Sequence, residues 1–574
     1  MKRCPECRRD YYDETLLYCL DDGNALLEGP ASGSGASDEP PTAILHETAS
    51  PAEAATRAQI HTTEQTMVLP SATGDIPRST SFDKRLLLAP LMLAVIILGG
   101  FFGYRYFDSA HSGRINSIAV LPFANASGDK ETDFLADGIA ETLINNFTKI
   151  PELKVTGRAT AFRFRGREGE PLEIGRELKV GSMLTGRLMQ RADQLSVQVD
   201  LISTSDGSQI WGNRYEGKTS DIVSIQQRIA TDVSSQLKLK LTGAQEQQIA
   251  KTYTQNPEAY QRYLRGRFYW NKRTAEALQK AIEEFQAASD ADPLYALAYV
   301  GLGDSYLLLP EYAGTPVNEA MPKAKAFAEK GLQIDPSLGE AYATLGLINH
   351  YMWQFDEADR EFQRAIAFNP NYPTVHHWYS NNLRERGDFK QALAEIRRAH
   401  ELDPLSPIIN INVGLMMALN GDIQGARGQF RRTVEMDPSW FNGHFHMGLI
   451  DVIDGQIAES IPHFQKSVEL APSALRPVGM LGFSLAVVGR RAEAIELLKR
   501  LEARHAQGVS AASNIATIFI GLGEKEKAYK WLEKGFLDKD IEISRSHWYP
   551  QFNSIRDEPR FKEIMEKVRK PKTP

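Results

Sequence analysis

Residues 337–370 read SLGEAYATLGLINHYMWQFDEADREFQRAIAFNP, and this stretch decides the fold because its pattern returns along the chain. Small residues recur at fixed points in each copy, such as Gly346 and Ala358 here. The copies end in prolines that are each 34 residues apart: Pro336, Pro370, Pro404, Pro438 and Pro472. A period of this length, with small residues where two helices approach closely, is typical of stacked helical hairpins. The sequence therefore predicts an all-α solenoid.

These units resemble tetratricopeptide repeats, and the resemblance implies a concave surface that binds a protein or peptide. Further units are expected on both sides of the strict run, so that about eight helical hairpins and a C-terminal capping helix fill residues 256–570. Extra residues at 310–318 separate the two helices of the second unit. Repeat arrays of this kind are rarely enzymes, so we expect no catalytic site.

In the resembling family, four positions of the first helix of each unit face the concave side. Counting from the fixed glycines and prolines gives this groove: His350, His377, Asn381, Arg384, Ile411, Leu415, Phe445, Leu449 and Phe483. The groove would be polar at one end and apolar further along, which suits an extended or helical peptide. Alternatively, Phe445 and Phe483 pack between neighbouring helices.

Capture of a C-terminal carboxylate is not expected in this groove. Asn381 and Asn412 stand where relatives with a carboxylate clamp carry asparagines. However, the positions of the clamp's lysine and arginine hold His377, Asn442 and His446.

Charge and cysteine content exclude some classes of function. The 574-residue chain has a formal net charge of −7, so no chain-wide basic surface indicates a nucleic-acid partner. All three cysteines lie in the first 19 residues, which leaves no structural disulfide for the rest of the chain.

The first 29 residues contain a pattern typical of a structural zinc site. Cys4 and Cys7 form a C-x-x-C pair, and Cys19 is followed by Asp22 where a second pair would have another cysteine. Three thiolates and one carboxylate can complete a tetrahedral shell. The segment resembles short bacterial zinc ribbons, and a metal-free, degenerate ribbon is the alternative.

Residues 30–82 are rich in Ala, Ser, Thr, Pro and Glu, which predicts a disordered tether. The uncharged run Leu86–Tyr104 then has the length that spans a bilayer, so residues 86–107 are expected to form one transmembrane helix. A buried core helix is the alternative. The charges around this run have a small bias toward a cytoplasmic N-terminus, and the family resemblance described below implies the same orientation. Gly99 and Gly103 form a G-x-x-x-G motif that permits close pairing of two such helices in a homodimer.

Residues 115–241 alternate strand and helix signals, beginning with the buried strand 117–123 and ending with an amphipathic helix at 222–241. The stretches SIAVLPFANASGDKETDFLADGIAETLINNF and LKVTGRATAFRFRG, together with the hairpins that follow, resemble the TolB-N-terminal-like (FlgO-like) α/β domain. That domain commonly precedes tetratricopeptide arrays in bacterial membrane proteins. The resemblance implies a single-pass protein of the bacterial cytoplasmic membrane, with its C-terminal domains in the periplasm or outside the cell.

The sequence thus predicts a membrane-anchored interaction scaffold, with transmembrane signalling as one hypothesis and a role as an envelope assembly factor as another. A third alternative is a nucleotide-binding enzyme. The stretch 212–219 fits the spacing of a phosphate-binding loop. The bulky residues inside that stretch favour a hairpin strand instead.

Overall fold

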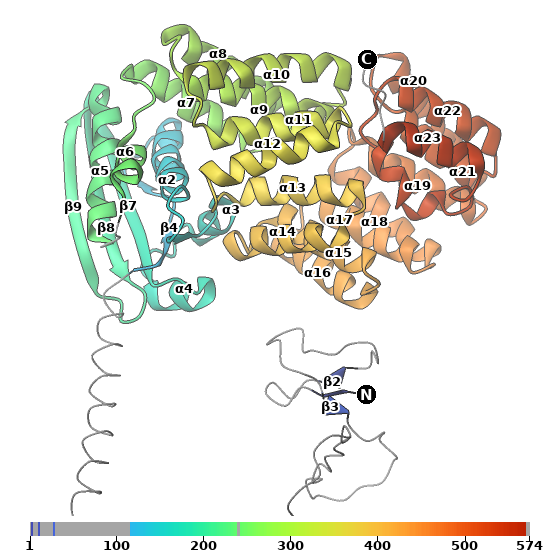
Figure 1. Ribbon diagram of the computed structural model, residues 1–574, viewed down its shortest axis with the longest axis horizontal. Helices are drawn as coiled ribbons and strands as arrows, with labels where there is room; N and C mark the ends of the chain where they lie inside the picture. The colour runs from blue at the N-terminus through green and yellow to red at the C-terminus, as the bar shows by residue number, and fades with distance from the viewer. Residues whose placement is uncertain (1, 4–9, 12–26, 29–114, 238–240, 570–574) are drawn as a thin grey trace, which may run out of the picture. The chain divides into compact units, whose positions relative to one another are not determined.

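The computed structural model describes residues 2–3, 10–11, 27–28, 115–237 and 241–569 (Figure 1). Four sets of predictions lie outside these residues: the zinc ligands Cys4, Cys7, Cys19 and Asp22, the tether 30–82, the membrane helix 86–107, and Gly99 with Gly103. Among the described residues, no helix is both long and apolar enough to cross a bilayer. Near the N-terminus, three short antiparallel strands pair in the order β2-β1-β3: β1 (Lys2–Arg3), β2 (Asp10–Tyr11) and β3 (Leu27–Glu28).

The next part of the chain is an α/β region built on a six-stranded mixed sheet of order β6-β4-β7-β8-β9, with β5 paired to β7. Its strands are β4 (Ser117–Val120), β5 (Ala124–Asn125), β6 (Lys154–Val155), β7 (Ser182–Arg191), β8 (Gln194–Ser203) and β9 (Gln209–Lys218). Its helices are α2 (Asp133–Phe147), α3 (Arg158–Ala161), α4 (Pro171–Leu178), α5 (Ile222–Gln236) and α6 (Gly243–Ala250), with short 3-10 turns η2 (Lys130–Thr132), η3 (Phe162–Phe164) and η4 (Thr219–Asp221). The predicted α/β alternation is confirmed, except that the helix expected at 222–241 ends at Gln236.

Helices cover both faces of this sheet. Successive side chains of the buried strand β4 point to opposite faces, so the strand contributes to a core on each side. Ile118 and Val120 belong to the core that includes α2 and α5. Ala119 belongs to a second core, which includes Leu178 of α4. An uninterrupted apolar strand such as β4 is typical of the parallel part of a sheet, and β4 indeed runs parallel to β6 and β7.

The stretch 212–219 lies mostly in β9 and does not form a phosphate-binding loop. β9 pairs antiparallel with β8, for example through Asn213 opposite Val199 and Tyr215 opposite Val197. Its backbone is extended and paired in a ladder instead of forming a concave turn. The nucleotide-binding alternative at this stretch is therefore wrong, and the hairpin interpretation is confirmed.

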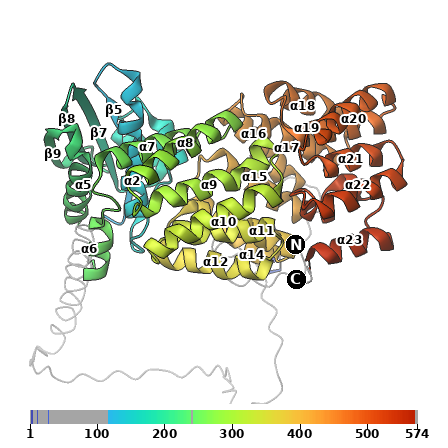
Figure 2. The ribbon, with the colours of Figure 1, turned by 90° about the horizontal axis from the view of Figure 1, so that it is seen from above.

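The remainder of the chain forms eight consecutive helix pairs, in which the first helix is called helix A and the second helix B (Figures 1 and 2). The pairs are α7 (Pro257–Trp270) and α8 (Ala275–Ala291), α9 (Ala296–Ala313) and α10 (Val317–Ile334), α11 (Gly339–Tyr351) and α12 (Phe355–Phe368), α13 (Pro373–Arg386) and α14 (Phe389–Leu402), α15 (Pro407–Leu419) and α16 (Ile423–Met436), α17 (Phe441–Ile453) and α18 (Ile457–Leu470), α19 (Leu475–Val487) and α20 (Arg491–Ala506), α21 (Ala512–Gly521) and α22 (Lys525–Leu537). Two 3-10 turns and a last helix follow: η5 (Ser544–His547), η6 (Pro550–Phe552) and α23 (Pro559–Arg569). The predicted all-α tetratricopeptide solenoid is confirmed.

The recurring glycine of helix A is required by the aromatic ring that packs on it from helix B. A methyl group at Gly346 would lie 2.7 Å from the ring of Phe362. The same contact recurs in the fifth pair, where a methyl at Gly414 would lie 2.5 Å from Phe430. Both rings are fully buried. The 34-residue period therefore encodes a close helix–helix contact that no larger side chain permits.

The turn between the two helices uses the left-handed backbone region at the residue before the N-cap of helix B. Glycine occupies this position in the last five pairs, with φ between 77° and 89°: Gly387, Gly421, Gly455, Gly489 and Gly523. In the first and third pairs the position holds Arg273, with φ of 54°, and Trp353, with φ of 63°. This region disfavours residues with a Cβ by roughly 1–2 kcal/mol. Two large side chains are thus present at positions where the fold prefers glycine.

The α/β region is docked on the turns of the repeat array by buried hydrogen bonds. The side-chain amide of Asn371 donates to the carbonyls of Ile150 at 2.8 Å and Leu153 at 3.1 Å. The backbone N–H of Thr160, in α3, donates to the carboxylate of Asp403 at 2.7 Å. Helix α2 lies between the sheet and α7 (Figure 1). This docking places α2 and α3 against the inner face of the repeats.

Candidate binding cavity

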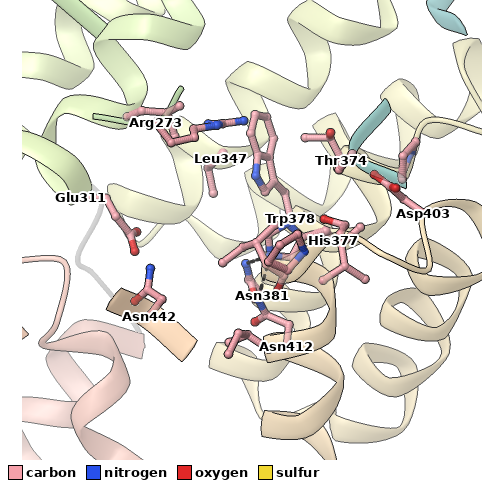
Figure 3. Close-up of a pocket in the computed structure, with 18 of the residues that line it drawn as sticks. Arg273, Glu311, Leu347, Thr374, His377, Trp378, Asn381, Asp403, Asn412 and Asn442 are labelled. Atoms are coloured by element: carbon pink, nitrogen blue, oxygen red, sulfur yellow. Dashed lines mark hydrogen bonds between the residues drawn. The ribbon is translucent and has the colours of Figure 1, made fainter. Parts of the chain in front are cut away.

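A cavity of about 410 Å³ lies on the inner face of the repeat array (Figure 3). The A helices of the first seven pairs, from α7 to α19, supply most of its walls. The docked α/β region contributes Glu141 and Arg158, and the chain around η5 contributes Arg545 and Trp548. This volume lies within the range of ligand pockets in proteins. The cavity is therefore the candidate functional site.

Six of the nine predicted groove residues line this cavity. They are His350, His377, Asn381, Arg384, Ile411 and Leu415. Asn412, Asn442 and His446, which the sequence places at clamp-related positions, line it as well. The repeat count therefore brings together residues of α11, α13, α15 and α17 around one space.

The other three predicted groove residues lie in the hydrophobic core and do not line the cavity. Phe445, Leu449 and Phe483 are buried in the core cluster of the later repeats. Turn η6 packs against α17 and α21, so that Phe445 lies beside Tyr549 and Phe552 of the C-terminal segment. A direct role of these three residues in partner binding stays a prediction, and the packing of Phe445 and Phe483 follows the alternative interpretation.

A histidine–asparagine network forms the polar wall of the cavity. The side-chain amides of Asn412 and Asn381 both approach Nε2 of His377, at 3.0 Å and 3.3 Å (Figure 3). Nε2 must therefore be the unprotonated acceptor nitrogen of a neutral ring. The Oδ1 atom of Asn381 is buried and has no hydrogen-bond partner within the described residues. The protein therefore leaves one acceptor of this wall unsatisfied.

The three cavity histidines are neutral at pH 7. Burial lowers the pKa of His377 to about 3, and Arg384 nearby lowers it further. Burial likewise lowers the pKa of His446 to about 3 and that of His350 to about 4. The histidines therefore contribute hydrogen-bonding groups to the cavity and no positive charge.

A buried ion-pair cluster stands where the α/β region meets the first repeat. Glu141 of α2 lies 2.7 Å from Nε of Arg158 and 2.8 Å from the guanidinium of Arg267. Burial alone would raise the pKa of Glu141, but the two guanidiniums outweigh it and hold that pKa below its usual value. Arg267 also pairs with Asp304 at 3.4 Å. The charges at this end of the cavity are thus largely compensated within the protein.

A second cluster connects the early repeats to the C-terminal part. Glu311 of α9 lies 3.1 Å from Arg476 and 3.5 Å from Arg545. Tyr351 donates a hydrogen bond to Glu311 at 3.3 Å. Although burial alone would raise it, the pKa of Glu311 is lowered to about 2 by the two guanidiniums and this hydrogen bond. Glu311 belongs to the extra residues of the second unit, which lengthen α9, so this insertion supplies a bridging residue.

Further contacts between distant segments enclose the predicted groove. The backbone N–H of Ser510 donates to the carbonyl of Gly314 at 3.3 Å. The ring of Trp353 stacks on Phe536 with centroids 5.5 Å apart. Trp548 donates to the buried carboxylate of Glu385 at 3.2 Å. The last repeats and the C-terminal segment therefore contact the second, third and fourth pairs, and the inner face is a cavity instead of an open groove.

Sequence reasoning did not find the cavity residues of the first pair, the seventh pair and the C-terminal segment. Arg273, Arg476, Arg545 and Trp548 all line the cavity. The sequence does contain a signal for Arg273, because this residue stands at the turn position where later pairs have glycine. The others come from contacts between segments far apart in the chain, which a repeat count does not detect. Within the described residues, no cluster of His, Cys, Asp and Glu has the arrangement of a metal site.

Two family models match separate parts of the chain. Residues 114–232 match the second domain of HilA/YgeH-like transcriptional regulators. Residues 270–314 and 380–439 match the tetratricopeptide repeat. The predicted resemblance of the α/β region to the TolB-N-terminal-like domain stays a prediction beside the first match.

Curated relatives share less than half of their own length with this chain. A putative adenylate cyclase of Rhizobium meliloti is 29% identical over 248 residues, which cover 42% of this chain and 42% of that protein. The transcriptional regulator HilA of Salmonella typhimurium is 29% identical over 131 residues, which cover 23% of this chain and 24% of HilA.

Solved structures with a similar local fold include PilF of Pseudomonas aeruginosa, which is 19% identical and covers 38% of this chain and 93% of its own, with a TM-score of 0.30. A tetratricopeptide protein of Thermus thermophilus is 19% identical and covers 33% of this chain and 98% of its own, with a TM-score of 0.30. The repeat match and the observed helix pairs together show that this chain contains tetratricopeptide repeats.

Proposed function

We propose that this protein is a membrane-anchored interaction scaffold that binds a protein or peptide in the cavity of its repeat array. The observation that carries the proposal is the cavity itself, which the A helices of seven successive pairs surround. Repeat arrays of this type use the surface formed by successive repeats to bind partners. The polar wall formed by His377, Asn381 and Asn412 adds hydrogen-bonding side chains of the kind that peptide groups use.

The remaining parts of the proposal rest on sequence. The uncharged run in residues 86–107 supports a single transmembrane helix with a cytoplasmic N-terminus, and Gly99 with Gly103 supports pairing of two such helices. Cys4, Cys7, Cys19 and Asp22 support a structural zinc site. A cytoplasmic module connected to a binding array across a membrane suits a signalling component.

A role as an envelope assembly factor is the alternative to signalling, and it rests on the same binding function. It would use the same cavity but would have no cytoplasmic partner for residues 1–29. The names of the curated relatives do not choose between these forms, because the shared stretches cover only part of each relative. We therefore transfer neither a cyclase activity nor a regulator's role to this chain.

The test compares two tryptophan substitutions in the full-length protein, purified from membranes in mild detergent. Asn381→Trp places a large side chain in the cavity, whereas Lys325→Trp places the same side chain on exposed α10. Proteins that co-purify with the wild type and with Lys325→Trp should be lost from Asn381→Trp. A partner set that Asn381→Trp retains in full would contradict binding in the cavity.

A further inference from the structure

Arg273 lines the cavity from a strained backbone position. It stands at the left-handed position of the first turn, with φ of 54°, where the last five pairs have glycine. Trp353, the other large residue at this position, is accounted for by its stacking on Phe536 in the closing contact. Strained backbone positions concentrate at functional sites.

The side chain of Arg273 is held flat at the edge of the cavity. Its guanidinium carbon lies 3.6 Å from the ring centroid of Trp270, which is a close cation–π contact. Figure 3 shows Arg273 reaching into the pocket from its turn, in the direction of Trp378. Stacking fixes the plane of the guanidinium and leaves its N–H edge available for hydrogen bonds.

Within the described residues, this guanidinium has neither a hydrogen-bond acceptor nor an ion-pair partner. The other cavity arginines differ in this respect. Arg267 pairs with Glu141, Arg384 with Glu385, and Arg476 with Glu311. Burial, together with the nearby charge of Arg267, lowers the pKa of Arg273, although Tyr312, Asp304 and Tyr372 oppose this shift. The half-buried guanidinium thus has no paired carboxylate, and the charge of Asp304 offsets it only in part, so an anion in the cavity would stabilise it.

We propose that Arg273, supported by Trp270, is an oxyanion-binding subsite of the cavity that takes a carboxylate of the bound peptide. A guanidinium edge and a carboxylate match as planar, bidentate partners. One guanidinium that has no paired carboxylate balances a single negative charge, which favours a carboxylate over a doubly charged phosphate. This inference rests on the proposed function, because the peptide is the source of the carboxylate.

The subsite is distinct from the positions of the carboxylate clamp, at which the sequence lacks the clamp's lysine and arginine. Those positions lie on the A helices of later repeats and hold His377, Asn442 and His446. Arg273 lies instead in the turn between α7 and α8, and it lines the same cavity as Asn381. A peptide would thus find a cation for its carboxylate in the same space as the polar wall of later repeats. The carboxylate belongs either to an acidic side chain or to the end of the chain.

The test measures thermal unfolding of the full-length protein in detergent while acetate or inorganic phosphate is titrated at constant ionic strength. Acetate should raise the unfolding midpoint of the wild type and of the control Lys325→Gln, a surface substitution that removes the same charge. In Arg273→Gln, the apparent affinity for acetate should fall by at least roughly tenfold, the loss expected for a hydrogen bond to a charged group. Arg273→Gly restores the glycine of the later turns and should unfold no earlier than the wild type while also failing to respond to acetate.

Two peptide probes then separate the sources of the carboxylate: an amidated peptide with one glutamate, and a neutral peptide with a free C-terminus. The peptide that raises the unfolding midpoint of the wild type, but not that of Arg273→Gly, identifies the source of the carboxylate. Equal acetate responses in the wild type and both Arg273 variants, no response in any, or a stronger response to phosphate would overturn the proposal. If the subsite fails while Asn381→Trp still abolishes partner capture, the proposed function stands without it.

Discussion

Replacing Phe445 with alanine tests whether this side chain packs the core or binds the partner. The ring is 1% exposed and contacts Phe464 and His446, with centroids 5.7 Å and 5.0 Å apart. The guanidinium of Arg476 lies 5.1 Å from the ring centroid. Because these neighbours belong to three different helices, the site cannot collapse around a methyl group. We therefore expect Phe445→Ala to cost about 3–5 kcal/mol of stability.

The matched control is Phe368→Ala, on the outer helix of the third pair. Phe368 is 42% exposed and stacks on one ring, that of Tyr342, at 5.6 Å. Loss of one exposed aromatic pair should cost roughly 0.5–1.5 kcal/mol. Chemical unfolding monitored by hydrogen exchange of α17 and α19 separates the two variants, because it reports the repeats that Phe445 connects. If Phe445→Ala unfolds no earlier than Phe368→Ala and still loses its partner, the packing interpretation is refuted.

Four other predictions concern the closing contact, pH, metal and topology. Glu311→Gln removes one of the two carboxylates that Arg476 and Arg545 share, while Glu542 remains paired with both, so it should cost about 1–3 kcal/mol and raise hydrogen exchange in residues 540–549; unchanged exchange there would contradict the closing role. His377 is neutral in the folded state, and its ring gains a proton mainly in the unfolded state, because its folded pKa is lowered to about 3. Its contribution to the free energy of unfolding is therefore full above the unfolded pKa and is lost as pH falls. Lowering the pH from 7 to 5.5 should cost about 1 kcal/mol more stability in the wild type than in His377→Gln, measured by urea unfolding. A peptide of residues 1–30 should bind one zinc, and Cys7→Ala should weaken binding more than Asp22→Ala in a competition titration; a peptide that stays metal-free in micromolar zinc would contradict the site. A reporter enzyme fused to the C-terminus should be active only outside the cytoplasm, and cytoplasmic activity would reverse the proposed topology.

The repeat architecture was predictable because its determinants are local and recur in the sequence. Gly346 and Phe362 lie sixteen positions apart within one unit, and their contact returns in the fifth unit as Gly414 and Phe430. The alternation of strands and helices in the α/β region is also encoded locally. The short apolar run that forms β4, for example, predicts a buried strand by itself, and all four of its residues are buried.

The far end of the groove was not predictable from the repeat count. The count places Phe445 on the concave side of an open array, and it does not include the chain that follows the last pair. Turn η6 covers α17 and α21, so that end of the inner face becomes core. The bridge from Glu311 to Arg476 and Arg545 likewise joins segments separated by well over a hundred residues. Contacts at such separations leave no periodic signal in one sequence.

Site-specific photo-crosslinking in native membranes tests partner binding in the cavity most directly. A photoreactive residue replaces Asn381, which lines the cavity, or Lys325, which lies on exposed α10. Mass spectrometry of the products then identifies the crosslinked segment. The proposed function predicts one defined peptide segment of a partner protein crosslinked at position 381 and absent at position 325. Crosslinks at position 381 that lead only to other parts of this chain, or the same partners from both positions, would contradict it.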